Sequence, residues 1–97
     1  MASYIVLTKF TDQGIRTVKD TVKRADMAKE LASKFGVRMQ DIRWTLGQYD
    51  IVTYCEADDE ASFAAFGLAL GAAGNVRFES MRAFSRDEMA SVLKKLP

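Results

Sequence analysis

Histidine is absent from the 97-residue sequence, and cysteine occurs once, at Cys55. Without histidine the chain cannot form a Ser-His-Asp or Cys-His catalytic site, a His-ligated zinc site or a proximal-His haem site. A single cysteine excludes an intramolecular disulfide, and a thiolate metal site within one subunit. We therefore expect a protein without metal or cofactor, in which Cys55 behaves as a small buried apolar residue.

The sequence also has no large excess of charge and no long apolar run. Fourteen basic residues face 13 acidic ones, so the net charge of +1 creates no field that attracts nucleic acid or anionic lipid. The most apolar stretch, 63–73, is too short to span a bilayer. The first residues lack the basic start and apolar core of a signal peptide. We expect a soluble, cytoplasmic protein that binds neither nucleic acid nor membranes.

The bulk composition is that of one small folded domain, residues 1–97. Apolar residues make up 48% and charged residues 28%, which are ordinary values for a globular chain. A chain of this length buries only a modest fraction of its surface. Pairing of two subunits would add buried area, and this is a first indication of an oligomer.

The hydrophobic pattern predicts four strands and two main helices. Runs rich in β-branched and aromatic residues predict strands at 4–10, 38–46, 49–56 and 75–84. Apolar residues at helical spacing predict helices at 21–35 and 59–71. A short helical segment at 12–18 and a C-terminal helix at 85–96 complete the set.

Individual residues indicate where these elements end and which side they bury. Gly36 is expected as a left-handed helix cap, and Ser85 with Glu88 forms a capping box. Gly47 and Gln48 predict a tight turn, which makes the second and third strands an antiparallel hairpin with Ile42, Trp44 and Leu46 on one face. The helix at 59–71 is expected to turn small residues inward: Ala61, Ala64, Ala65, Leu68 and Ala72.

The order β-α-β-β-α-β predicts an α+β, ferredoxin-like fold with a four-stranded antiparallel sheet plus a C-terminal helix. Both main helices of such a fold lie on one face of the sheet. The strands are nevertheless apolar on both faces, since Ile5 and Leu7 alternate with Tyr4 and Val6. An open apolar face is covered most simply by a second copy. We therefore predict a homodimer built as a dimeric α+β barrel, whose dimers can assemble further.

Segment 45–52, Thr-Leu-Gly-Gln-Tyr-Asp-Ile-Val, resembles the signature that names the GYD family. Segments 4–7, 74–77 and 81–85 resemble that family as well, so that the likeness extends over nearly the whole chain. The resemblance implies a dimeric α+β barrel. It implies no particular chemistry, because this architecture hosts oxygenases, dismutases, ligand sensors and decarboxylases.

Seven polar or aromatic side chains of the predicted strands and hairpin are candidates for ligand binding. They are Arg43, Trp44, Tyr49, Asp50, Tyr54, Arg77 and Arg82. In the structural interpretation, which we favour for the hairpin, Asp50 bonds nearby backbone amides to fix the turn and Tyr49 packs at the barrel rim. In the functional one, Tyr49 and Asp50 act as acid and base at a pocket mouth.

Trp44 and the arginines have the same two interpretations. Trp44 belongs either to the core or dimer interface, or to a pocket wall. A strand arginine either pairs with a carboxylate such as Glu79 or Asp50, or projects into a cavity where its guanidinium binds a carboxylate or enolate.

Three functions fit this sequence. The first is a homodimeric small-ligand-binding or sensor protein. The second is a cofactor-independent enzyme of the oxygenase or isomerase type, acting on a small organic substrate, in which an arginine steadies an enolate and Asp50 or Tyr49 moves a proton. The third is a structural or assembly role. A cavity lined by Arg43, Trp44 and Tyr54 would favour the first two, and a barrel filled with side chains the third.

Overall fold

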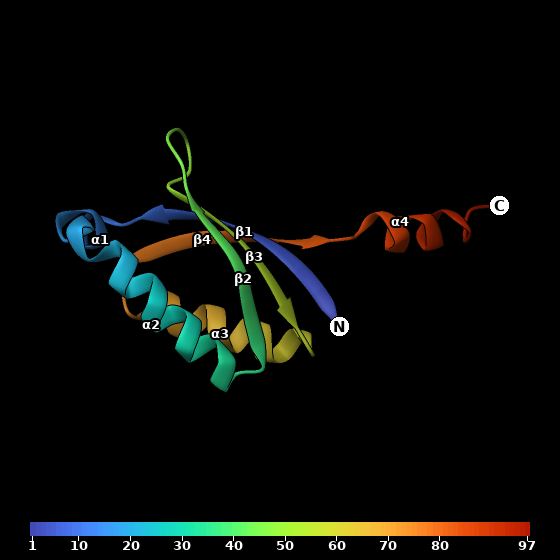
Figure 1. Ribbon diagram of the computed structural model, residues 1–97, viewed down its shortest axis with the longest axis horizontal. Coiled ribbons are helices and arrows are strands. Elements are labelled where there is room, and N and C mark those ends of the chain that lie inside the picture. Colours follow the sequence, from blue (N-terminus) through green and yellow to red (C-terminus); the bar gives the residue numbers. More distant parts are fainter.

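The computed structural model describes all 97 residues of the chain (Figure 1). The strands are β1 (Ala2–Phe10), β2 (Val37–Trp44), β3 (Ile51–Ala57) and β4 (Val76–Ala83). The helices are α1 (Asp12–Arg16), the 3₁₀ helix η1 (Val18–Asp20), α2 (Thr21–Lys34), α3 (Glu60–Ala72) and α4 (Arg86–Leu93). Every predicted element is present.

The four strands form one sheet in the order β2-β3-β1-β4, in which every neighbouring pair is antiparallel. Helices α2 and α3 lie together on one face of this sheet, and no helix covers the other (Figure 1). We call these the helical face and the open face. The α+β, ferredoxin-like architecture predicted from the sequence is confirmed.

Helix ends follow the local chemistry of the sequence. The Thr11 and Asp59 side chains accept hydrogen bonds from backbone amides in the first turns of α1 and α3. Both bonds of the capping box at α4 are present, at 3.1 Å from Glu88 N to Ser85 Oγ and 2.8 Å from Ser85 N to Glu88 Oε1. Gly36 has a φ of 72° and ends α2 in the left-handed conformation.

The connection between β2 and β3 is a six-residue loop, 45–50, and is longer than the tight turn that the sequence indicated. Leu46, which was expected to share a face with Trp44, is fully exposed in this loop. The backbone N–H of Thr45 donates to Asp50 O across the base of this loop, and the backbone N–H of Asp50 donates to Thr8 O on β1, each at 2.8 Å. The prediction for Leu46 was therefore wrong.

Helix α3 faces the sheet with the side opposite to the one predicted from the sequence. The residues expected to face inward lie toward solvent, and Leu68, the largest of them, is 76% exposed. Phe63 and Phe66 are buried instead, and the Phe63 ring stacks on Tyr4 at 3.9 Å between centroids. A phenyl ring removes far more apolar surface from water than a methyl group, and this difference decides which side of the helix faces the sheet.

Strand β2 contains an irregularity between Met39 and Asp41. The extra residue, Gln40, shifts the alternation by one position, as in a β-bulge. Met39 and Ile42 therefore both face the helices, although strict alternation would place them on opposite faces.

The C-terminal helix α4 projects away from the rest of the domain at the end of β4 (Figure 1). The molecule measures 52 × 30 × 18 Å, and its radius of gyration of 14.6 Å exceeds the roughly 13 Å of a compact chain of 100 residues. The apolar residues of α4, among them Met89 and Leu93, remain exposed. None of the helices is both long and apolar enough to cross a membrane.

Candidate functional site

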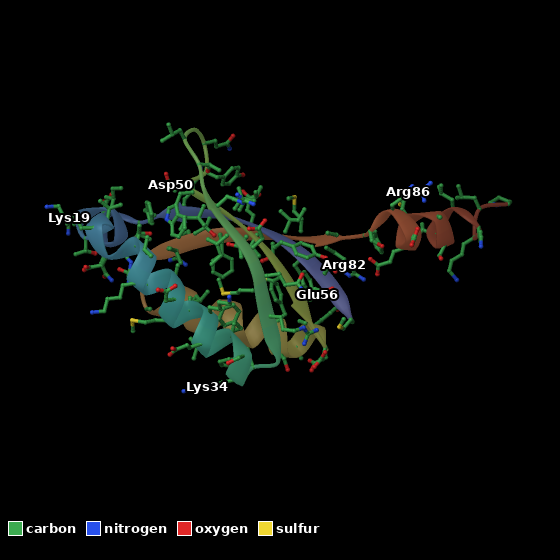
Figure 2. All side chains as sticks on the ribbon, viewed as in Figure 1. Lys19, Lys34, Asp50, Glu56, Arg82 and Arg86 are labelled. Carbon is green, nitrogen blue, oxygen red and sulfur yellow. The ribbon has the colours of Figure 1, made fainter.

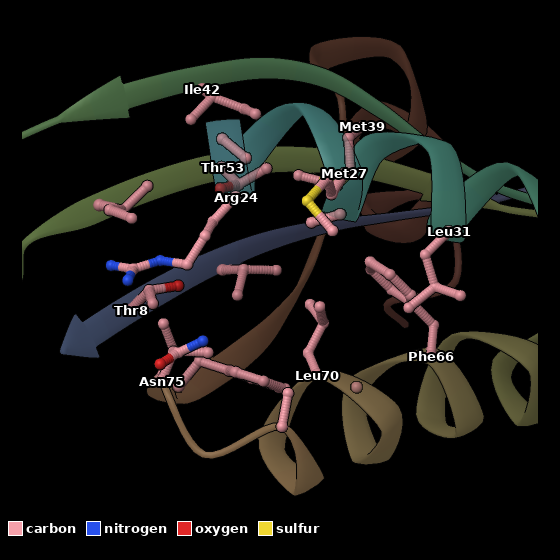
Figure 3. A pocket seen from close by; sticks show the side chains of 18 of the residues that line it. Thr8, Arg24, Met27, Leu31, Met39, Ile42, Thr53, Phe66, Leu70 and Asn75 are labelled. Atoms are coloured by element: carbon pink, nitrogen blue, oxygen red, sulfur yellow. The ribbon is translucent and has the colours of Figure 1, made fainter. Parts of the chain in front are cut away.

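A cavity of about 460 Å³ lies between the helical face of the sheet and helices α2 and α3 (Figure 3). Its volume and its mainly apolar wall are those of small-molecule sites. Met27 and Glu30 of α2 belong to the wall and are exposed, so that the cavity opens to solvent along this helix. The packed core lies beside the cavity, between the same sheet and helices, around Val37, Cys55 and Phe66.

The two ends of the cavity differ in polarity, as Figure 3 shows. One end is apolar and is formed by Met27, Leu31, Met39, Phe66 and Leu70. The other end carries the polar side chains of Arg24, Thr8, Thr53 and Asn75. An elongated molecule in this space would have one apolar end and one polar end.

The floor of the cavity follows from strand alternation. Every second residue of β1 and β3 points to the helices, and Thr8 and Thr53 occupy two of these positions, where they are 7% and 6% exposed. Cys55 belongs to the same row and is buried, as expected. Burial raises the pKa of its thiol to about 11. Cys55 is therefore protonated at neutral pH and acts as a wall residue rather than a nucleophile.

Arg24 brings a positive charge to the polar end. Its Nη1 donates to Thr17 O at 3.1 Å and to Thr17 Oγ1 at 2.5 Å, and its Nη2 donates to Gly14 O at 3.0 Å. The guanidinium lies 6.0 Å from the centre of the Phe10 ring. All its protein partners are neutral, and no carboxylate forms an ion pair with it. The cavity thus contains a held cation without a counter-charge.

Helix α1 locks the polar end in place. Thr11 donates its backbone N–H to Asn75 O at 3.1 Å and its hydroxyl to Gly74 O at 2.5 Å. Gln13 Nε2 donates to Ala73 O and to Asn75 Oδ1. These bonds fasten the short helix to the turn between α3 and β4, and so fix the segment to which Arg24 is bonded.

The open face of the sheet holds three of the seven candidates predicted from the sequence. Arg43, Tyr54 and Arg77 lie on it. The Arg43 guanidinium pairs with Asp41 at 3.2 Å, and Tyr54 donates its hydroxyl to Ser3 Oγ at 3.0 Å. Between Arg43 on β2 and Arg77 on β4 runs an apolar strip, formed by Ile5, Leu7, Val52, Tyr54 and Met81.

Tyr49 and Asp50 lie in loop 45–50. The Tyr49 hydroxyl donates to Glu79 at 3.0 Å, and this hydrogen bond raises the pKa of the phenol. The Asp50 carboxylate accepts from Phe10 N at 2.9 Å (Figure 2 shows its place at the loop end of the sheet), so it fixes the end of β1 rather than the amides of its own turn. Tyr49 and Asp50 are thus engaged with different partners.

Trp44 and Arg82 lie on the helical side of the sheet. Trp44 is 42% exposed and donates its indole N–H to Thr21 Oγ1 at 3.0 Å. Arg82 donates to the carbonyl oxygens of Ser3 and Ala83, at the end of the sheet from which α4 departs (Figure 2). Neither Glu79 nor Asp50 pairs with an arginine, contrary to the pairing considered from the sequence.

None of the seven candidates lines the cavity. Within one chain, the sheet separates Trp44 from Arg43 and Tyr54, so that these three cannot share one pocket.

The residues that sequence reasoning missed are those of the polar end. Thr8 and Thr53 carried a signal, since each is a hydroxyl on the apolar side of an alternating strand. Arg24 carried none, because it stands beside Lys23 in a basic stretch that is typical of a solvated helix face.

Comparison with known proteins gives one family and one relative. The family model described as the GYD domain matches residues 4–93. A protein of Thermus thermophilus, named as a glutamine synthetase and cystathionine β-lyase binding protein, is 35% identical over 95 residues, which cover 97% of this chain and all of that protein. No solved structure matches the chain.

Proposed function

The chain belongs to the GYD domain family, and we propose that it is a cytoplasmic, homodimeric binding protein that senses a small ligand and regulates a partner protein. The cavity between the sheet and helices α2 and α3 is the observation that carries this proposal. The partner protein rests on the similarity to a relative that is named for its binding of two enzymes.

The cavity suits an organic occupant. Water can enter it through the open side, but the wall is mainly apolar. An organic molecule that displaces this water removes apolar surface from contact with water, which is favourable.

The homodimer is supported by the open face. The apolar strip on that face runs along β1 and its neighbours, and charged or polar residues flank it, among them Lys9, Arg43 and Glu79. An apolar centre with a polar rim is the anatomy of a protein interface. Two open faces in contact would form a dimeric α+β barrel and leave the cavity, on the other side of each sheet, accessible.

Native mass spectrometry of the purified protein, followed by the same measurement after denaturation, tests this proposal. We expect a dimer mass with a small co-purified molecule that is lost on denaturation. Titration of the emptied protein with an extract of small metabolites should restore the added mass and raise Tm. A clean dimer that takes up nothing from the extract would contradict the sensor function and favour a structural role. A monomer mass at micromolar concentration would overturn the dimer.

A further inference from the structure

We propose that the cavity binds a small organic monocarboxylate, with its carboxylate at Arg24 and its apolar tail between Leu31 and Leu70. This inference rests on the proposed ligand-sensing function and names the class of ligand.

The donors of Arg24 identify the polar group of the ligand. A guanidinium has five N–H donors. Thr17 and Gly14 accept three of these, which leaves the N–H of Nε and one N–H of Nη2 without a protein acceptor. A carboxylate accepts two such bonds at once and supplies the missing counter-charge. The hydroxyls of Thr8 and Thr53 lie at the same end and can donate to the same anion.

The remaining charges of the wall limit the ligand to one negative group. Apart from Arg24, the charged lining residues are Glu30 and Lys34, which are exposed on α2 and have opposite signs. Both lie on the part of α2 that borders the apolar end, where their charges cancel, so a second carboxylate would gain no net attraction there. A ligand ammonium group beside Arg24 would be repelled. The site therefore selects an acid against an amine, and a monoacid against a diacid.

The volume indicates the size of the tail. The cavity has room for about 15 water molecules at roughly 30 Å³ each, and so for a ligand of similar heavy-atom number. A small molecule is thus the occupant that the dimensions favour.

Calorimetric titration of the full-length protein with three probes of equal chain length tests this assignment. The probes are octanoate, octanol and octylamine. We expect octanoate to bind about 10- to 100-fold more tightly than octanol, since a hydrogen-bonded charge distinguishes them, and octylamine not to bind. Equal binding of octanoate and octanol would overturn the role of Arg24.

Two pairs of variants locate the site. Arg24→Gln should lower the affinity for octanoate about 10- to 100-fold and leave that for octanol unchanged, whereas Arg16→Gln, at an exposed arginine of α1, should change neither. Because Arg24 also holds Thr17 and Gly14, a second pair avoids it. Ala28→Phe fills the cavity and should abolish binding of both probes, and Ala64→Phe, on the exposed side of α3, should not. Unchanged octanoate affinity in Ala28→Phe would place the ligand elsewhere.

The two proposals fail in different ways. If mass spectrometry finds a neutral or cationic ligand that Ala28→Phe excludes, the sensor function stands and the monocarboxylate assignment is wrong. If octanoate binds as predicted but no cellular ligand co-purifies or binds from the extract, the chemistry of the cavity stands and the sensor function is wrong.

Discussion

Asp50 joins two segments that are 40 residues apart, since its carboxylate accepts the backbone N–H of Phe10 at 2.9 Å. The same residue donates its own N–H to Thr8 O. Together these bonds tie loop 45–50 to the end of β1, next to the polar end of the cavity. Asp50 is the last residue of the motif that names the family, and its structural role is to join loop 45–50 to strand β1.

We expect Asp50→Ala to lower the free energy of unfolding by about 1–3 kcal/mol, because the amide of Phe10 loses a charge-assisted partner. Urea denaturation at pH 7 measures this change. Asp26→Ala, at an exposed aspartate of α2, is the matched control and should change the stability by less than about 0.5 kcal/mol. Equal effects of the two variants would show that the bond to Phe10 contributes nothing.

Cys55 makes stability depend on alkaline pH. Burial raises the pKa of its thiol to about 11, above the value of 9.0 for an unperturbed thiol, so between these values the unfolded chain releases a proton that the folded chain retains. Stability is then fully present below pH 9 and falls as the pH rises toward 11, by about 2 kcal/mol. Thermal unfolding at pH 8 and pH 10.5 measures the loss. The comparison is with Cys55→Ala, which lacks the thiol and should therefore lose less stability between the two pH values. An identical loss in both proteins would contradict the assignment.

At the scale of the elements, α1 is held against the turn that follows α3. Gly14 is buried there, and a Cβ at this position would lie 2.0 Å from Asn75 O. Only glycine allows so close an approach of two backbone segments. Gly71 is the opposite case, because a Cβ there would meet nothing within 4 Å and the residue lies inside a helix.

Gly14→Ala should therefore destabilise the protein by more than about 2 kcal/mol, because α1 must move away from Asn75. Gly71→Ala should stabilise it by about 0.4–1 kcal/mol, since alanine lowers the entropy of the unfolded chain. Urea denaturation of both variants measures whether each substitution lowers or raises the free energy of unfolding. Destabilisation of similar size at both positions would mean that the contact of α1 with the turn has no special role.

The elements themselves could be predicted from the sequence because each carries its own local signal. Ser85 with Glu88 marks the start of α4, and Gly36 the end of α2, from chemistry within a few residues. The inward side of α3 could not be predicted as easily. Both sides are apolar, and only the sheet, through the stacking of Tyr4 on Phe63, selects the phenyl side.

The candidate site was less predictable than the fold, for a related reason. Its polar end joins Thr8, Arg24 and Thr53 from three elements, and its apolar end depends on the irregularity that turns Met39 inward. The alternation of β1 and β3 marks Thr8 and Thr53 one at a time, but no local pattern indicates that they lie near Arg24 or that Met39 faces the helices. The candidates that the sequence did single out lie mainly on the open face or in loop 45–50, where polar strand residues are conspicuous.

At the scale of the whole molecule, the chain leaves two apolar surfaces uncovered. One is the strip on the open face, and the other is the apolar side of α4 with Met89, Val92 and Leu93. A helix of eight residues is marginal in water by itself, even with a capping box. Helix α4 therefore depends on contacts that its own domain does not supply, and subunit pairing is the means we propose.

Leu7→Lys tests both surfaces together. Leu7 lies at the centre of the open face, opposite Val52 and Glu79, so a lysine there would place two ammonium groups inside the dimer interface. We expect a folded monomer by light scattering at micromolar concentration, whereas Val22→Lys, at an exposed position of α2, should remain a dimer. Hydrogen exchange then reports on α4. Amides of residues 89–93 should be protected in the wild-type dimer and lose their protection in the Leu7→Lys monomer. Protection that survives in the monomer would show that α4 is stable without a second copy, and a Leu7→Lys protein that remains a dimer would place the interface away from the open face.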